Sequence, residues 1–172
     1  MIRGIFVGRF SPFHLGHLES IKFILDRVDE LIIVIGSAQQ SHTLSNPFTA
    51  GERLSMIHQS LKTEKIPLEN IYLVPIYDIY RNPVWVNHVQ SFCPSFSIVF
   101  TNNSLIRRLF SESGFEVESP NIVKRTVYKG SHIRQLMIEN NKWEHLVPTS
   151  VFKIIANIDG VERIQQLNQQ TD

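Results

Sequence analysis

The sequence predicts an α/β protein with a doubly wound parallel sheet of about five or six strands, helices on both faces and a helical C-terminal subregion. Two observations predict this fold class. Up to about residue 120, short apolar runs alternate with segments whose apolar residues recur every three or four positions. Beyond residue 120 the helical spacing continues without further strand-like runs. Such alternation is typical of right-handed β-α-β units in one parallel, Rossmann-like sheet.

Five segments have the length and composition of strands. They are IRGIFVG (2–8), ELIIVIG (30–36), NIYLVPI (70–76), FSIVFTN (96–102) and GFEVES (114–119). A strand of a parallel sheet is apolar at successive positions when helices cover both of its faces. The first four segments have this character and are therefore expected to be covered on both faces.

Helical spacing predicts six further elements. Four alternate with the strands, at 14–28, 49–62, 83–93 and 103–113, and two follow residue 120, at 131–140 and 143–158. Local signals mark their ends: a capping box (Thr49 with Glu52), a first helical position (Pro83), a position after a helix end (Gly114) and an N-cap (Ser131). The polar tail after residue 158 is expected to fray.

Length and composition indicate a single domain, residues 1–172, with a βα core (1–120) and a mainly helical C-terminal part (121–172). Seventeen Lys and Arg residues balance 16 Asp and Glu residues without a basic run, so no nucleic-acid partner is expected. The single cysteine, Cys93, cannot form an intrachain disulfide. No apolar run approaches a membrane span and the N-terminus lacks a signal-peptide core, so a cytoplasmic protein without membrane contact is expected.

In a sheet of this kind the ligand lies beyond the carboxyl ends of the strands. The segments that follow the predicted strands hold most of the unusual polar residues: 8–17, 36–48, 77–85 and 101–103, joined by 128–134 from the last crossover. The motifs G-x-x-x-x-G-K-[ST] and G-x-G-x-x-G are both missing from the sequence. A P-loop kinase and an ordinary dinucleotide dehydrogenase therefore lose their main signals.

The stretch GRFSPFHLGH (8–17) places His14 and His17 three positions apart, on one face of a helix N-terminus. Unpaired backbone N–H groups and the helix dipole favour an anion there, and two imidazole donors would bind phosphate oxygens. Gly16 would allow close approach of a ligand, and Arg9 adds a cation. Two alternatives are that the histidines only cap and pack the helix, or that they share a zinc ion, for which no credible third ligand is evident.

A second anion site is predicted in YKGSHIR (128–134). Gly130 and Ser131 would open a helix, and Arg134, three positions after Ser131, would place a delocalised cation beside the helix N-terminus. The alternative is an ordinary surface helix capped by Ser131, with a solvated arginine.

Two phosphate-binding helix ends without a side-chain nucleophile between them indicate transfer of a nucleotidyl group between phosphates. A phosphate monoester loses its second proton near a pKa of about 6, so such an acceptor needs no general base at neutral pH. Attack on the α-phosphate of ATP develops charge on the equatorial oxygens and the departing pyrophosphate. Histidine donors, Arg134, backbone amides and Mg²⁺ would stabilise this charge.

The H-x-G-H of FHLGH together with GSHIR resembles the paired signatures of the nucleotidyltransferase superfamily. More closely, GRFSPFHLGHL, IGSAQQSHTLSNPFTAGER, NPVWVNHV and YKGSHIR are similar to archaeal nicotinamide-nucleotide adenylyltransferases, with matches over nearly the whole chain. The resemblance implies that ATP and nicotinamide mononucleotide (NMN) give NAD⁺ and pyrophosphate. It also implies Mg²⁺ held through the ATP phosphates rather than by a protein metal site, and a homo-oligomer, of which a hexamer is one form.

Carried over to this sequence, the resemblance gives catalytic contacts with the ATP phosphates to four residues, Arg9, His14, His17 and Arg134, with His17 the most sensitive. The rest of the ATP site would comprise Gly8, Phe10, Gly16, Tyr128, Gly130 and Ser131. The resemblance places the NMN site at Asp78, Ile79, Asn82 and Trp85. Ser37 and Gln39, which follow an apolar strand, and the aromatic Phe48 are further candidates for this site. An indole face attracts a flat cation such as the pyridinium ring, although core packing is an alternative for Trp85 and Phe48, and an ordered turn is an alternative for Ser37 and Gln39.

Two residues depart from the family pattern. Ser11 stands where the family motif carries Gln, and Ser45 stands where some relatives carry a charged residue, which bears on how tightly and how selectively the acceptor is held. Arg53 is expected to be structural, on a solvated or ion-paired helix face. Two other functions stay open: an adenylyltransferase for another phosphate monoester such as phosphopantetheine, and a non-catalytic nucleotide-binding sensor.

Overall fold

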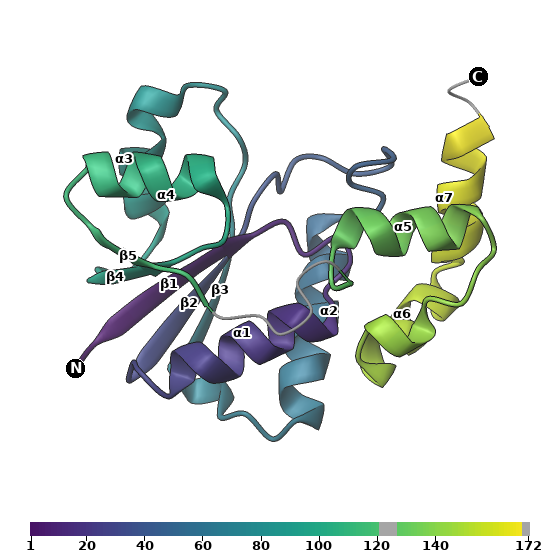
Figure 1. Ribbon diagram of the computed structural model, residues 1–172, viewed down its shortest axis with the longest axis horizontal. Coiled ribbons are helices and arrows are strands. Elements are labelled where there is room, and N and C mark those ends of the chain that lie inside the picture. Colours follow the sequence, from purple (N-terminus) through teal and green to yellow (C-terminus); the bar gives the residue numbers. More distant parts are fainter. Residues whose placement is uncertain (121–126, 170–172) are drawn as a thin grey trace.

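The computed structural model describes residues 1–120 and 127–169. Its sheet has five parallel strands in the order β3-β2-β1-β4-β5 (Figure 1). They are β1 (Arg3–Gly8), β2 (Glu30–Ile35), β3 (Ile71–Pro75), β4 (Ile98–Phe100) and β5 (Glu116–Glu118). Central β1 pairs Gly4 with Leu31 of β2 and with Ile98 of β4. The predicted doubly wound α/β fold is confirmed, with one observed strand inside each of the five predicted segments.

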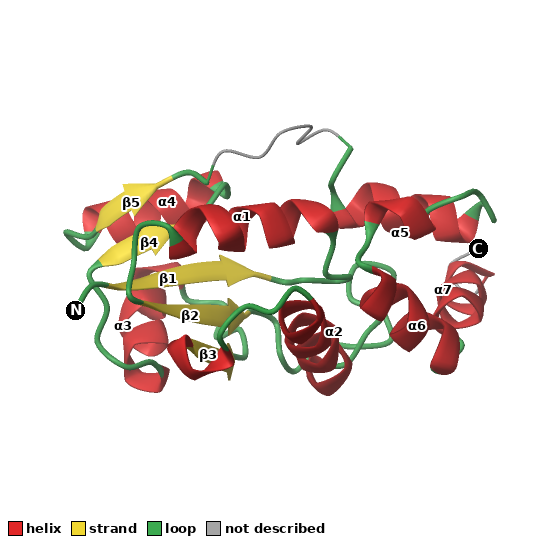
Figure 2. Ribbon diagram, turned by 90° about the horizontal axis from the view of Figure 1, so that it is seen from below, coloured by secondary structure: helices red, strands yellow, loops and turns green. Residues whose placement is uncertain are grey.

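A helix lies in each crossover of the sheet. These helices are α1 (Leu15–Leu25), α2 (Ala50–Thr63), followed by the 3-10 turn η1 (Leu68–Asn70), α3 (Asn82–Phe92) and α4 (Ser104–Glu112). The C-terminal part contains α5 (Gly130–Ile138), the 3-10 turn η2 (Glu144–Leu146), α6 (Thr149–Asn157) and α7 (Gly160–Gln169). Figure 2 shows the strands pointing toward α5, α6 and α7, so the C-terminal helices lie beyond the carboxyl ends of the sheet.

The helix ends follow from local chemistry. The Thr49 hydroxyl accepts a hydrogen bond from the Glu52 amide at 3.2 Å, and the Glu52 carboxylate accepts one from the Thr49 amide at 2.8 Å, which is the predicted capping box. Pro83 lies in the first turn of α3, where its missing N–H costs no helical bond. Gly114 follows α4 with φ of 84°, a conformation that favours glycine.

Two apolar clusters fill the two faces of the sheet. Alternate side chains along the strands point to one face of the sheet and pack against α1, α2 and the C-terminal helices: Phe6, Leu31, Ile33 and Ile35. The intervening side chains point to the opposite face and pack against α3 and α4: Ile5, Val7, Ile32 and Val34. Each buried aliphatic side chain stabilises the fold by about 1.5–3 kcal/mol. The expected coverage on both faces therefore holds for β1 and β2.

Strand β3 departs from that expectation. It is the edge strand, with Tyr72 and Pro75 exposed and its other residues half-buried. Its apolar composition suggested an inner strand because composition does not reveal strand order.

Three expectations for the C-terminal part were wrong. The tail after residue 158 continues as α7 through Gln169, because Ile164 is fully buried and gives this polar helix a place in the core; residues 170–172 lie outside the described part. The segment 143–158 is not one helix, since α6 begins only after Pro148. Ser131 is not the N-cap: α5 begins at Gly130, and the capping position is Lys129, which makes no side-chain capping bond.

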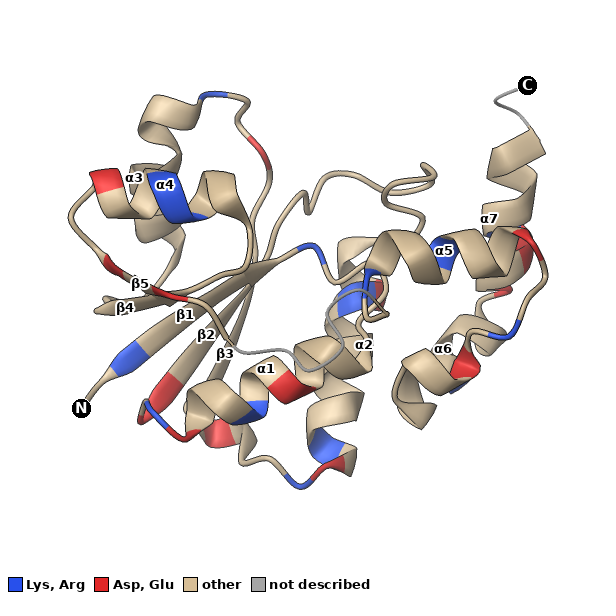
Figure 3. Cartoon of the chain, viewed as in Figure 1, with Lys and Arg blue, Asp and Glu red and all other residues tan. Residues whose placement is uncertain are grey.

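Charged residues of both signs are spread over the helices and loops, and they form no continuous basic band along the described chain (Figure 3). None of the described helices is long and apolar enough to cross a membrane. The even spread of charge matches the near-balanced composition.

Candidate active site

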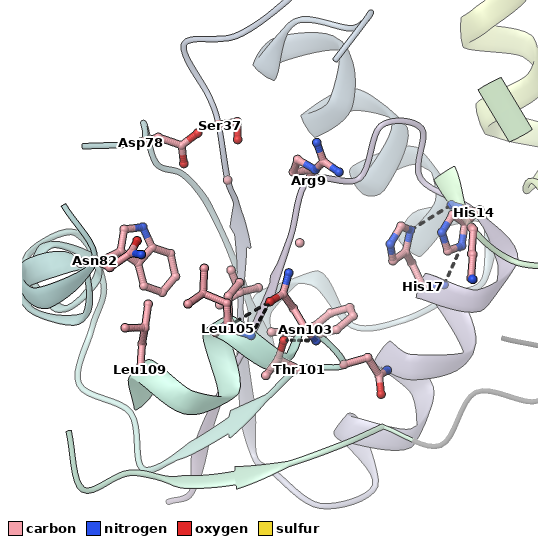
Figure 4. Close-up of a pocket in the computed structure, with 18 of the residues that line it drawn as sticks. Arg9, His14, His17, Ser37, Asp78, Asn82, Thr101, Asn103, Leu105 and Leu109 are labelled. Atoms are coloured by element: carbon pink, nitrogen blue, oxygen red, sulfur yellow. Dashed lines mark hydrogen bonds between the residues drawn. The ribbon is translucent and has the colours of Figure 1, made fainter. Parts of the chain in front are cut away.

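A cavity of about 520 Å³ lies at the carboxyl end of the sheet. It opens beside β1, where the strand order reverses between the β2 side and the β4 side. Such a switch point is where doubly wound sheets bind their ligands. The lining combines the end of β1, the segments after β2, β3 and β4, the start of α1, faces of α3 and α4, and the segment before α5 (Figure 4).

The cavity brings together residues from all five of the segments singled out in the sequence. Nine of the predicted site residues line it: Gly8, Arg9, His14, His17, Ser37, Asp78, Asn82, Trp85 and Tyr128. The others lie outside the lining: Phe10, Gly16, Gln39, Phe48, Ile79, Gly130, Ser131 and Arg134. Phe48 is fully buried in the core cluster, where its ring lies close to Gly160 at the start of α7.

His14 and His17 form a reciprocal capping box at the start of α1. The His17 amide donates to His14 Nδ1 at 3.2 Å, and the His14 amide donates to His17 Nδ1 at 3.3 Å. The two rings stack with centroids 3.5 Å apart and planes 15° apart, and the His17 ring also packs on Phe10 at 4.7 Å. The sequence predicted the shared face and left capping and packing open as an alternative; the structure shows that both histidines do cap the helix, each ring accepting from the amide of the other.

This geometry defines the protonation of both rings. Each Nδ1 accepts an N–H, so in a neutral ring the proton is on Nε2. Burial lowers the pKa of His14 to about 3. Burial, and secondly repulsion from His14, lowers the pKa of His17 well below its usual range. At neutral pH the pair therefore presents two neutral Nε2–H donors rather than an imidazolium or an acid–base pair.

The second predicted anion site packs directly against the first. Arg134 Nη1 on α5 donates to the Ser11 carbonyl at 2.6 Å, across 123 positions of the chain. A Cβ on Gly16 would lie 2.7 Å from Tyr128 Cβ, so only glycine allows this approach of α1 to the segment before α5. Burial, and secondly the charge of Arg9, lowers the pKa of Arg134 to about 10, which leaves it a cation at neutral pH. The hydroxyl of Ser11 is buried without a partner in the described residues.

Arg53 on α2 does not lie on a solvated or ion-paired face as expected. It is fully buried, and its guanidinium donates to main-chain carbonyls of residues before α1 and after β2. Burial, and secondly the charge of Arg9, lowers its pKa, whereas Asp78 raises it. The contacts of Arg53 are those of a structural residue, as expected. The predicted solvated or ion-paired environment was wrong, because Arg53 is buried and its partners are backbone carbonyls.

A pair of loops beside the cavity is joined by glutamine side chains. Gln39 accepts from the Asp78 amide at 3.0 Å and donates to the Asp78 carbonyl at 3.4 Å. Gln40 donates to the Tyr80 hydroxyl at 2.9 Å and accepts from the Asn46 side chain at 2.7 Å. The loop after β2 thus holds the loop after β3, from which Asp78 reaches the cavity (Figure 4).

The wall opposite β1 is largely apolar. Trp85 lines the cavity and packs edge-on against Phe110 at 5.7 Å, so it belongs both to the core and to the site. Leu105 and Leu109 of α4 continue this wall, and Asn103 caps the N-terminus of α4, where its side-chain oxygen accepts from the Leu105 amide at 2.9 Å. The sequence places the segment 101–103 after a strand but gives its residues no particular role.

Several lining residues were not predicted: Phe6, Val7, Gly36, Tyr80, Thr101, Asn102, Asn103, Leu105, Ile106, Leu109 and Lys129. The carboxyl-end rule points to those that directly follow β2, β3 and β4. The α4 leucines have helical spacing and are indistinguishable in sequence from core residues.

The described residues contain no group of three or more His, Cys, Asp or Glu side chains that could hold a metal ion. Asp78 is the carboxylate in the cavity lining. Magnesium is commonly bound through substrate phosphates with few protein ligands. The donor set therefore fits a cation that arrives on a nucleotide rather than one held by a protein cage.

The fold and the place of this cavity are typical of a nucleotide-binding α/β protein. The family described as cytidylyltransferase-like matches residues 5–154, and the chain belongs to it. Among its relatives, the nicotinamide-nucleotide adenylyltransferase of Saccharolobus solfataricus is 48% identical over 97% of both chains. That of Archaeoglobus fulgidus is 50% identical over 97% of this chain and 98% of its own. The resemblance predicted from the sequence is confirmed.

A solved structure supports the fold. The bifunctional NMN adenylyltransferase/ADP ribose pyrophosphatase of Francisella tularensis, complexed with AMP and a manganese ion, superimposes with a TM-score of 0.82 at 22% identity. The match covers 98% of this chain and 53% of that longer chain.

Proposed function

We propose that this protein is a nicotinamide-nucleotide adenylyltransferase, which transfers AMP from ATP to NMN and releases pyrophosphate. The observation that carries the proposal is sequence identity: over nearly its full length, the chain is 48% and 50% identical to two relatives named nicotinamide-nucleotide adenylyltransferase. The cavity is consistent with it, since imidazole and guanidinium groups near the end of β1 face an apolar, aromatic wall on α3 and α4.

In this reaction an oxygen of the NMN phosphate attacks the α-phosphorus of ATP, a new P–O bond forms, and the bond to the β-phosphate breaks as pyrophosphate leaves. The acceptor is already largely a dianion at neutral pH, so the reaction requires positioning and charge stabilisation rather than a general base.

Within the proposal, the phosphates of ATP lie toward Arg9, His14, His17 and Arg134. The neutral Nε2–H groups of the histidines donate to oxygens whose charge grows in the transition state, and the arginines supply fixed positive charge. A divalent cation, Mg²⁺ in this proposal, would be held through the phosphates and would neutralise part of their charge.

The nicotinamide nucleotide lies, in the same proposal, toward Asp78, Asn82 and Trp85. The indole of Trp85 offers a face to the pyridinium ring, an attraction of about 0.5–2 kcal/mol. Gln39 was expected to contact NMN. Its side-chain amide is instead hydrogen-bonded to the backbone of Asp78, which favours a role in holding the loop after β3.

The decisive test is incubation of the protein with ATP, MgCl₂ and a panel of acceptors, with NAD⁺ measured enzymatically and pyrophosphate measured separately. NMN should give both products in equal amounts. Product from phosphopantetheine but none from NMN would favour the other adenylyltransferase, and ATP binding without pyrophosphate release would identify a sensor. A homo-oligomer and a cytoplasmic location are further parts of the proposal, the first testable by light scattering.

A further inference from the structure

Arg53 is a fully buried cation beneath the cavity. Its Nη1 donates to the Arg9 carbonyl at 2.9 Å and to the Gly36 carbonyl at 2.8 Å, and its Nη2 donates to the Ser37 carbonyl at 3.0 Å. Arg9, Gly36 and Ser37 all line the cavity. No ion pair to Arg53 is found among the described residues. A buried charge without a paired carboxylate is costly. Here main-chain carbonyls accept the hydrogen bonds of Arg53, and the carboxylate of Asp78 adds an attraction without direct contact.

The position of these carbonyls makes the arrangement relevant to an anionic ligand. Chains leaving the carboxyl ends of parallel strands carry carbonyl groups with no ladder partner, and their negative ends disfavour phosphates nearby. Arg53 donates to one such carbonyl after β1 and to three after β2, the third being the Gln40 carbonyl at 3.5 Å. One planar guanidinium therefore holds both loops together and partners their oxygens.

We propose that Arg53 is a positioning residue for nucleotidyl transfer: it fixes the loops after β1 and β2 so that Arg9 and the neighbouring backbone meet the ATP phosphates. The inference deepens the proposed function and rests on it, since ATP is taken as the ligand. Arg53 itself contacts main-chain carbonyls and acts on the nucleotide only through these loops.

The helix that carries Arg53 is itself held firmly. Its first turn has the capping box of Thr49 and Glu52, and Arg163 on α7 donates two bonds to the Glu52 carboxylate at 2.8 and 2.9 Å. Glu52 and Arg53 are neighbours, so one anchors α2 to the C-terminal helix and the other anchors the two loops to α2. A lysine at position 53 would keep the charge but could not reproduce the planar fork of donors.

The test compares Arg53→Met and Arg53→Lys with the matched control Arg163→Met, which removes an arginine bound to the same helix but not to a residue lining the cavity. The affinity for MgATP is measured calorimetrically without NMN, and kcat and KM are measured with NMN. Arg53→Met should weaken MgATP binding about tenfold and lower kcat/KM about 10²-fold, the size of effect expected when reacting groups are misplaced by about 1 Å. Arg53→Lys should rescue less than half of this loss.

Arg163→Met should lower the melting temperature and leave the MgATP affinity within about twofold. Wild-type affinity and kcat/KM in both Arg53 variants, below their melting temperatures, would overturn the inference and leave Arg53 a folding residue. If Arg53→Met does not fold, Arg53→Lys decides by the same measurements. Should the wild type bind MgATP but make no NAD⁺, the proposed function fails while the effect of Arg53 on MgATP binding is still measured.

Discussion

At the scale of single residues, the two stacked histidines are the most informative feature of the cavity. Each ring uses Nδ1 to cap the backbone of the other, which leaves Nε2–H as the group available to a ligand. The spacing of three positions was enough to predict that they share a face. It could not predict reciprocal capping, because that depends on the extended backbone of His14 and on the surrounding burial.

His17→Ala should lower kcat on the order of 10²-fold with little change in KM, because its donor acts mainly on charge that develops in the transition state. Steady-state kinetics with ATP and NMN check this. His58→Ala, on the half-buried face of α2 away from the cavity lining, is the control and should retain wild-type kinetics. A loss confined to KM would instead indicate that His17 contributes only ground-state binding.

The low pKa of His14 also predicts how stability depends on pH. Its pKa is about 3 when folded and near 6.5 when unfolded, so below pH 6.5 the unfolded chain binds more protons than the folded one. Acidification from pH 6.5 to 5 should therefore lower the free energy of unfolding, with a slope for this residue that rises toward a limit of about 1.4 kcal/mol per pH unit. The shift of His17 acts in the same direction.

Urea denaturation at pH 7.5, 6.5, 5.8 and 5 measures this dependence. His14→Asn is the informative variant, because asparagine keeps an N-cap acceptor but does not titrate. Its stability should fall less steeply with acidification than that of the wild type. Parallel curves for the two proteins would contradict the burial of a neutral His14.

At the scale of elements, the loops after β2 and β3 act together through Gln39. The side-chain amide of this glutamine accepts from the Asp78 amide and donates to the Asp78 carbonyl, as the backbone of a paired strand would. The sequence placed both segments at the carboxyl end of the sheet, which follows from β-α-β alternation. It could not predict that Gln39 and Arg53 bind backbone groups, because such partners leave no signature of residue type.

Gln39→Met should raise KM for NMN about tenfold and change KM for ATP less than twofold, because methionine fills the same space without the two bonds that hold the Asp78 loop. The comparison is Gln59→Met, an exposed position on α2, which should leave both constants unchanged. Equal effects on both substrates would mean that Gln39 supports the cavity as a whole rather than its acceptor side.

At the scale of the whole molecule, the C-terminal helices belong to the same apolar cluster as the sheet. Phe48 in the loop before α2, Ile155 on α6 and Ile164 on α7 are all fully buried within it, and Arg163 joins α7 to Glu52. The sequence predicted a fraying tail because α7 is mostly polar. Its few apolar residues, such as Ile164, become buried only when α7 packs in the cluster that α2 and α5 also form. The shared cluster predicts that the sheet and the C-terminal helices of the described residues unfold as one cooperative unit.

Gly160→Ala tests this coupling at the start of α7. A Cβ at this position would lie 2.9 Å from Ile155 Cγ2, 3.0 Å from Phe48 Cε1 and 3.2 Å from the Ile155 carbonyl oxygen. Overpacking of this kind costs about 1–3 kcal/mol, so the whole thermal transition should move to lower temperature by several degrees and stay single. The control is Gly51→Ala, an exposed position in the first turn of α2 where the nearest atom is 3.9 Å away, and where alanine should be neutral or raise stability by up to about 1 kcal/mol. Calorimetry distinguishes the outcomes: a second, separate transition in Gly160→Ala would show that the C-terminal helices form a unit of their own, because a mutation in a shared core cannot destabilise one part and spare the other.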